Sequence, residues 1–318
     1  MKQKEILLFG ASGQIGRNLI RKLSQNNYKI TAVTRNTHRA GYILKTQANP
    51  GYLDLIEVKN FNSNKIEELM QNCSICINLI GILFEKKKNQ FKTIHTDLPD
   101  LLSQKANKYK IEKFIHLSSL GIENATDSKY AISKLEGEKK IKKNFENSII
   151  LKPSIVYSVD DKFTTSFMSL LSNLPIMPLY FNGKTKFIPI HVTDLVDIIF
   201  NMIEGKKNNL TIECVGPETY TFKEIIKKLL ISIKKKRLLI PLPFHIASFT
   251  AKVLQLLPNP LLTEDQLKLL KYDNINSGLY KTNFDLGINA NKKFDTEIAK
   301  YSYNWRHGGQ FSEKIDIK

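Results

Sequence analysis

A glycine-rich turn near the amino end most constrains what this chain can fold into. The apolar run at residues 6–9 leads into Gly10, Gly13 and Gly16, and an amphipathic stretch at residues 15–23 follows. This order predicts a strand, a turn and a helix. Gly10 permits the tight turn, Gly13 lets a ligand approach the backbone, and Gly16 lets the helix pack closely against the strand. An ordinary strand-to-helix turn is the alternative, but this context favours an anion site at the positive end of the helix. The expected cofactor contacts in this segment are Gly10, Ser12, Gly13, Gln14, Ile15, Gly16 and Arg17.

The end of the second predicted strand carries a cation and no acid. Residues 30–33 form the strand, and Thr34, Arg35 and Asn36 follow it. An acidic residue at this point usually binds the free ribose 2′-hydroxyl of NAD, whereas a 2′-phosphate requires a cation. Arg35, with Arg17 just inside the first predicted helix and Arg39 nearby, therefore favours NADP(H) over NAD(H). Arg39 is expected to be a solvated surface arginine.

Strand-like and helix-like stretches alternate through the first half of the chain. This alternation predicts an α/β fold with a Rossmann-type doubly wound parallel sheet and a smaller C-terminal α/β region that covers the substrate. We expect residues 1–160 to form the NADP(H)-binding domain, with later returns to the sheet, and residues 161–318 to form a mixed, mainly helical substrate or partner region. The predicted strands are residues 6–9, 30–33, 53–58, 75–80, 114–117 and 149–151.

A tyrosine and a lysine four residues apart predict proton-transfer chemistry. Tyr130 and Lys134 lie in a helix-like stretch and therefore share a face. A free phenol titrates near ~10, and the neighbouring ammonium is expected to lower that pKa. Lys134 would also reach the nicotinamide ribose, while Tyr130 would pass a proton to or from a substrate oxygen. Ser119, just after a predicted strand, is expected to hold that oxygen, with Ser118 as the substitute if the register differs by one.

The composition excludes several other classes of protein. The net charge of +18 comes mostly from scattered lysines and accompanies no nucleic-acid motif, so solvated helix faces are the expected reason for it. Three cysteines predict a reducing compartment, and Cys73 and Cys76 are expected to be packing residues. The histidines show no metal-ligand spacing, so no metal is expected. We expect the protein to be cytoplasmic.

One C-terminal segment favours contact with a membrane or a partner. The basic cluster of residues 234–237 precedes an apolar run, and apolar residues then recur at roughly helical spacing from 246 to 257. A basic cluster beside an amphipathic helix is typical of a protein that lies on a membrane surface or docks on a partner. A core-facing helix explains the same pattern. The first interpretation places the protein at the cytoplasmic face of the inner membrane.

The order of these motifs resembles the extended or atypical branch of the short-chain dehydrogenase/reductases. The closer resemblance covers nearly the whole chain and is to the family of the NADPH-binding accessory subunit of respiratory complex I, with its bacterial relatives. It is carried by residues 78–83 (NLIGIL), 114–121 (FIHLSSLG), 151–157 (LKPSIVY), 187–194 (FIPIHVTD) and 262–267 (LTEDQL). Besides the glycine turn, the expected NADPH contacts are Arg35, Asn60, Leu79, Ile80, Gly81, Leu117, Ser118, Tyr130, Lys134, Pro153, Ile155 and Val156.

The resemblance implies a link to quinones and leaves three functions open. The first is an oxidoreductase acting on a quinone or quinone precursor, at the membrane or attached to complex I. The second is a non-catalytic complex I subunit in which NADPH is structural. The third is a nucleotide-sugar epimerase or dehydratase, which the ten residues between Ser119 and Tyr130 disfavour because they leave little room for a substrate loop. His95 stands where many relatives of the extended branch have Asn.

Overall fold

The main sheet of the protein is built from strands in both halves of the chain. The computed structural model describes residues 5–61, 64–242, 255 and 262–310. Eight parallel strands form the sheet in the order β14-β11-β6-β5-β4-β1-β2-β3. Their bounds are β1 Glu5–Phe9, β2 Lys29–Thr34, β3 Leu53–Glu57, β4 Ile75–Asn78, β5 Lys113–Leu117, β6 Ser148–Pro153, β11 Leu210–Cys214 and β14 Lys281–Thr282. The predicted doubly wound α/β fold is confirmed.

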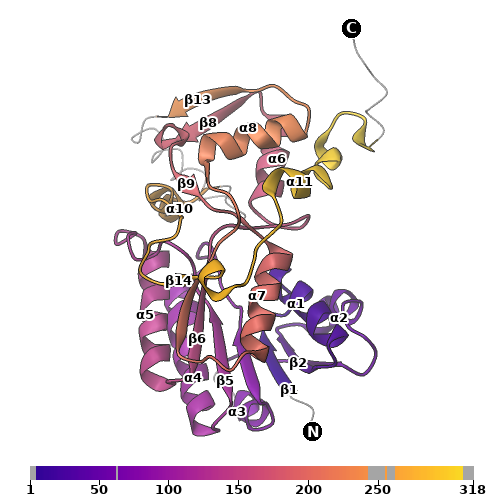
Figure 1. Cartoon of the computed structure of the whole chain (residues 1–318), viewed down its shortest axis with the longest axis vertical. Helices are drawn as coiled ribbons and strands as arrows, with labels where there is room; N and C mark the ends of the chain where they lie inside the picture. The colour runs from indigo at the N-terminus through magenta and orange to yellow at the C-terminus, as the bar shows by residue number, and fades with distance from the viewer. Residues whose placement is uncertain (1–4, 62–63, 243–254, 256–261, 311–318) are drawn as a thin grey trace.

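Helices cover both faces of this sheet (Figure 1). On one face lie α1 (Gln14–Gln25) and α7 (Val192–Glu204). On the other face lie α3 (Asn64–Gln71), α4 (Leu98–Lys108), which continues the π-helical turn η1 (Lys92–Asp97), and α5 (Lys129–Asn144). Helix α2 (Thr37–Lys45) joins β2 to β3.

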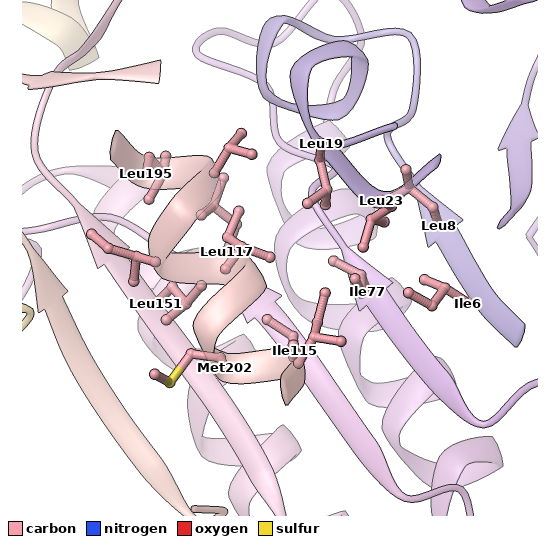
Figure 2. Close-up of a cluster of buried hydrophobic side chains, with 14 of the residues drawn as sticks. Ile6, Leu8, Leu19, Leu23, Ile77, Ile115, Leu117, Leu151, Leu195 and Met202 are labelled. Carbon is pink, nitrogen blue, oxygen red and sulfur yellow. The ribbon is translucent and has the colours of Figure 1, made fainter. Parts of the chain in front are cut away.

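Successive side chains of a strand point to opposite faces of the sheet, so each face has its own hydrophobic core. Figure 2 shows Ile6 and Leu8 of β1 near Leu23 of α1, in a cluster that extends through Leu117 to Leu195 of α7. The intervening strand residues, Leu7 and Phe9, pack with α3 and α4 instead. A parallel strand that is buried on both faces must be apolar at successive positions, which is what residues 6–9 show.

A smaller lobe stands beyond the carboxyl ends of the strands, at the top of Figure 1. Its core contains Met168, Phe187, Phe222 and Phe294. Its helices are α6 Thr164–Asn173, α8 Phe222–Ser232, α10 Glu264–Leu269 and α11 Phe294–Ala299, with 3-10 turns η2 Phe181–Gly183 and η4 Ser302–Trp305. A further 3-10 turn, η3 Phe284–Leu286, follows β14 and packs on the core of the main sheet. Its paired strands are β7 Val156–Tyr157 with β10 Ile190–His191, β8 Ile176–Tyr180 with β13 Leu238–Leu242, and β9 Lys186–Phe187 with β12 Tyr220–Thr221.

The basic cluster of residues 234–237 takes part in the packing of this lobe. Lys235 and Arg237 donate hydrogen bonds to the carbonyls of Leu171 and Ser172 near the end of α6. These two cations therefore satisfy carbonyls of a helix end. The apolar residues predicted to follow as an amphipathic helix fall almost wholly outside the described residues. Within the described ranges, no helix combines the length and the apolar character needed to cross a bilayer.

Candidate functional site

The glycine turn has the close approaches that its spacing predicts. Gly10 has φ +82°, and a Cβ atom there would lie 2.9 Å from the carbonyl carbon of Leu79. A Cβ atom on Gly16 would lie 2.4 Å from the carbonyl oxygen of Gly10. Helix α1 has Gly13 as its N-cap, with no capping side chain and no acid in its first turn. Its first N–H groups and its positive end therefore form a cradle that suits the pyrophosphate of a dinucleotide.

A loop from the second half of the chain closes one side of this cradle. The Gln14 side chain donates to Ser158 Oγ at 2.8 Å. Arg17 pairs with the Asp160 carboxylate and donates to the Ser12 carbonyl at 2.7 Å. The predicted contacts Gln14 and Arg17 are thus already engaged within the protein. Sequence reasoning missed Ser158 and Asp160, whose only signal was that they follow the residues 151–157 motif.

The residues expected at the adenosine end are exposed. Arg35 directly follows β2, and within the described residues its side chain makes no hydrogen bond or ion pair. Asn36 instead caps α2 by accepting a hydrogen bond from the Arg39 N–H. An acid lies nearby on β3, but Glu57 accepts hydrogen bonds from both the N–H and the hydroxyl of Thr37. Asn60 is exposed just after β3.

The end of β4 connects the glycine turn with the predicted proton-transfer residues. The N–H of Leu79 donates to the Phe9 carbonyl, which keeps this segment against β1, and the N–H of Ile80 donates to the Asn78 side chain. Strand β4 ends at Asn78, two residues before its predicted end. A Cβ atom on Gly81 would lie 3.5 Å from Lys134 Nζ, so the two expected site regions meet here.

Ser119, Tyr130 and Lys134 come together at the carboxyl edge of the sheet. Ser119 shares a side-chain hydrogen bond with the Tyr130 phenol. Lys134, whose side chain is buried, donates from Nζ to the Leu117 carbonyl at 2.9 Å and lies 5.9 Å from the centroid of the Tyr130 ring. The helical spacing therefore places both side chains on the face of α5 that looks toward the end of β5.

The expected lowering of the tyrosine pKa is wrong for this structure. Burial raises the pKa of the Tyr130 phenol, an effect that the Ser119 hydrogen bond opposes and the Asp265 carboxylate reinforces. Burial also lowers the pKa of Lys134 to about 8. The physical reason is that water is excluded from both groups, which disfavours each charged form. Tyr130 is consequently a protonated phenol at neutral pH.

Ser118 contacts a different part of α5, about two helical turns beyond Tyr130. Its hydroxyl donates to the buried Glu138 carboxylate, which also accepts from Lys152 Nζ at 2.9 Å. Lys152 is fully buried and pairs as well with Glu123. The hydroxyl that acts on the Tyr130 phenol therefore comes from Ser119, as the first choice of register predicts.

His95 forms the back wall of the site. Its ring lies 5.2 Å from that of Tyr130 and stacks on Phe91 at 5.3 Å. Nε2 accepts from the Ile82 N–H at 3.1 Å, so Nδ1 carries the proton and donates to Ser133 Oγ at 3.0 Å. Burial first, and the Lys134 charge second, lower its pKa to about 2. His95 is therefore a neutral structural contact, and it lies in a π-helical turn of the kind that often marks functional sites.

The last group of expected cofactor contacts follows β6. The Pro153 carbonyl accepts from the Leu120 N–H, which ties this turn to the segment after Ser119. Ile155 and Val156 are partly exposed, and Val156 begins the short strand β7. The turn thus lies at the same sheet edge as the proton-transfer residues.

Comparison with known proteins identifies relatives over almost the full chain. The chain is 26% identical over 313 residues to the mitochondrial NADH-ubiquinone oxidoreductase 40 kDa subunit of Neurospora crassa, covering 98% of this chain and 80% of that one. It is 25% identical over 270 residues to the mitochondrial NADH dehydrogenase [ubiquinone] 1 alpha subcomplex subunit 9 of Mus musculus, covering 84% and 72%. These relatives agree with the resemblance to complex I accessory subunits.

Solved structures and a family model agree on the fold. The UDP-glucuronic acid 4-epimerase from Bacillus cereus in complex with NAD superposes with a TM-score of 0.70 at 16% identity, over 95% of this chain and 100% of that one. The model of the NAD dependent epimerase/dehydratase family matches residues 6–214, which include the glycine turn, the Tyr130 helix and the sheet as far as β11. The chain therefore belongs to the NAD dependent epimerase/dehydratase family, with the nucleotide-binding fold of the extended short-chain dehydrogenase/reductases.

Proposed function

We propose that the protein is an NADP(H)-dependent reductase of a quinone or quinone precursor. The observation that carries this proposal is the intact set of Ser119, Tyr130 and Lys134 at the carboxyl edge of the sheet. In this proposal residues 1–160 hold the nucleotide and residues 161–318 supply the substrate side.

The uncapped first turn of α1 suits the pyrophosphate. Gly10 and Gly16 allow the close packing of this turn, since side chains there would meet the backbone of Leu79 and of Gly10. Arg35, exposed and unpaired within the described residues, supports a 2′-phosphate and hence NADP(H). Lys134 would bind the ribose hydroxyls, for which its Nζ gives up or shares its bond to the Leu117 carbonyl.

The protonation state of Tyr130 favours reduction. When bound, NADPH supplies the hydride. Ser119 would hold the carbonyl oxygen of the substrate, and the Tyr130 phenol would donate its proton to that oxygen while the hydride adds to the carbonyl carbon. The carbonyl π bond breaks, one C–H and one O–H bond form, and Tyr130 recovers a proton from solvent. For a quinone, the new C–H proton is then lost to solvent while the second carbonyl oxygen gains a proton, which gives the aromatic quinol. A phenol whose pKa is raised by burial enters this step in the required protonated form.

The surroundings of Tyr130 support an apolar substrate. The residues packed with it are Ile82, Phe91, Ile122, Ala125, Ala131, Leu135, Leu269 and Tyr272. This apolar side of the Tyr130 surroundings lies opposite the polar groups Ser119 and Lys134, and it suits a quinone ring better than a nucleotide sugar.

Stopped-flow measurement of NADPH oxidation with a panel of short-chain quinones and quinone precursors tests the proposal. Tyr130→Phe should abolish turnover and leave NADPH affinity nearly unchanged, because the phenol acts on the substrate. Tyr272→Phe is the matched control, since it removes a phenol from the same cluster and should keep the activity. Full activity in Tyr130→Phe would overturn the mechanism.

A second candidate rests on the two mitochondrial relatives. In it the protein is an accessory subunit of a respiratory NADH–ubiquinone oxidoreductase, located at the membrane surface, and the nucleotide is a structural ligand. Mild extraction from native membranes distinguishes the two candidates. NADPH on protein that migrates with a large respiratory complex, with no quinone turnover after its release, would support the accessory subunit.

A further inference from the structure

The first turn of the Tyr130 helix is held from a distant part of the chain. The Asp265 carboxylate accepts hydrogen bonds from the N–H of Lys129 at 2.7 Å and from the N–H of Tyr130 at 3.1 Å. It also accepts from Ser128 Oγ at 2.9 Å, and the same Ser128 oxygen accepts from the Ala131 N–H at 3.3 Å. One carboxylate thus organises the N–H groups that the start of α5 would otherwise leave without partners.

Asp265 is itself well fixed, because its short helix is anchored on both sides. A reciprocal capping box between Thr263 and Gln266 starts α10. Leu267 of α10 is buried beside Tyr180 of β8, in the smaller lobe. Leu269 packs against the cluster that contains Tyr130. Helix α10 therefore joins the smaller lobe to the start of α5.

The position of Tyr130 makes this connection important for the site. Tyr130 is the second residue of α5, so a shift of the first turn moves its phenol directly. We infer that Asp265 is a positioning residue for the reaction, which sets the Tyr130 phenol against Ser119 and makes that placement depend on the docking of α10. The inference rests on the proposed function for the role of Tyr130.

The charge of Asp265 acts on the same phenol. The groups that face Tyr130 are Ser119 after β5, the neutral His95 of η1, Lys134 of its own helix and Asp265 of α10. Asp265 is the carboxylate among them. Burial raises the pKa of the phenol most, the Ser119 hydrogen bond lowers it, and the Asp265 charge, a smaller effect than either, raises it and so helps to keep Tyr130 protonated. Geometry and charge therefore both predict an effect on Tyr130 itself.

The experiment reads Tyr130 without substrate, so it remains informative if the proposed reaction is wrong. 3-Fluorotyrosine is placed at position 130 of the full chain, and its ¹⁹F resonance is followed against pH. Hydrogen–deuterium exchange of residues 129–131 is measured on the same proteins. The variants are Asp265→Asn, which removes the charge at nearly constant size, and Asp265→Glu as the conservative rescue. Glu264→Gln is the matched control, because it removes one carboxylate from the same helix and is not bonded to α5 in the described structure.

We expect Asp265→Asn to speed exchange at residues 129–131 by about tenfold, a typical effect of weakening a helix cap. We also expect it to shift the phenol titration to lower pH and to change the ¹⁹F shift of the protonated form. Asp265→Glu should restore the titration in part, and Glu264→Gln should resemble the unmodified chain. Faster exchange with an unchanged ¹⁹F titration and shift would reduce Asp265 to a helix cap and overturn the inference, as would no effect on either measurement.

Discussion

Lys134 Nζ is bonded to the Leu117 carbonyl at 2.9 Å, in a site from which water is excluded. Burial lowers the pKa of this lysine from its ordinary 10.5 to about 8. Below pH 8 the lysine is charged in both the folded and the unfolded chain, and its desolvation destabilises the fold. Between about pH 8 and 10.5 the folded chain loses the proton first, so this cost is relieved as the pH rises.

We therefore expect the stability difference between wild type and Lys134→Met to depend on pH. From pH 7.5 to 10.5 the unfolding free energy of the wild type should rise relative to the variant by roughly 3 kcal/mol, the equivalent of the shift in pKa. Urea unfolding of both proteins at matched pH values measures this difference. Parallel stability curves would show that Lys134 keeps an ordinary pKa in the fold.

The two adjacent serines should separate function from stability. Ser119→Ala removes the hydroxyl beside Tyr130 and should lower quinone reduction by about 10-fold or more, with a small change in stability. Ser118→Ala removes a donor to the buried Glu138 and should cost about 1–3 kcal/mol of stability. Urea unfolding and stopped-flow rates on both variants check this. A rate loss in Ser118→Ala together with a stability loss in Ser119→Ala would show that Ser118, and not Ser119, serves the site.

Part of this site could be predicted from sequence because its pattern is local. Three glycines after an apolar run indicate the cradle, and a spacing of four puts Tyr130 and Lys134 on one helix face. The environment of these groups could not be predicted in the same way. The pKa of Tyr130 depends on burial by surrounding elements, and Asp265 reaches it across 135 positions of sequence.

The sheet likewise has strands that a local sequence pattern predicts and one strand that it does not. The predicted strands are apolar and lie in the chain between helix-like stretches, so periodicity and alternation locate them. Strand β14 has only two residues, Lys281 and Thr282, which carry no apolar pattern. It joins the sheet by pairing with Ile212 and Glu213 of β11, a relation between segments that only the folded structure shows.

Gly16 offers a direct test of the close packing of α1. Gly16→Ala would place a methyl group 2.4 Å from the Gly10 carbonyl oxygen, so the turn or the helix has to move. We expect a loss of about 1–3 kcal/mol in stability and at least a tenfold loss in nucleotide affinity. Gly41→Ala is the control, because its nearest neighbour is 3.8 Å away and alanine favours the helix α2. Calorimetric titration with NADPH measures the affinity of both variants. Equal affinities would contradict the proposal that the glycine turn binds the nucleotide.

Arg35 is the test of cofactor choice. If it binds the 2′-phosphate, Arg35→Ala should weaken NADPH by about 1–3 kcal/mol and leave NADH almost unaffected. Arg39→Ala should change neither affinity, because Arg39 is expected to be a solvated surface residue. Fluorescence titration with both nucleotides gives the four affinities. An equal loss for NADPH and NADH in Arg35→Ala would remove Arg35 from the phosphate site.

Asp160 pairs with Arg17, in the first helix after the proposed pyrophosphate cradle. The ion pair is partly exposed, with 23% of the Arg17 and 40% of the Asp160 side chain accessible, so its own contribution to stability is small. Because the carboxylate neutralises an arginine that would otherwise serve the pyrophosphate, Asp160→Asn should tighten both NADPH and NADH by about twofold to fivefold. Asp54→Asn, which breaks a pair with Lys29 on the outer strands, is the control and should leave affinity unchanged. Weaker binding in Asp160→Asn, measured by the same titration, would show instead that the acid orders the loop that closes the cradle.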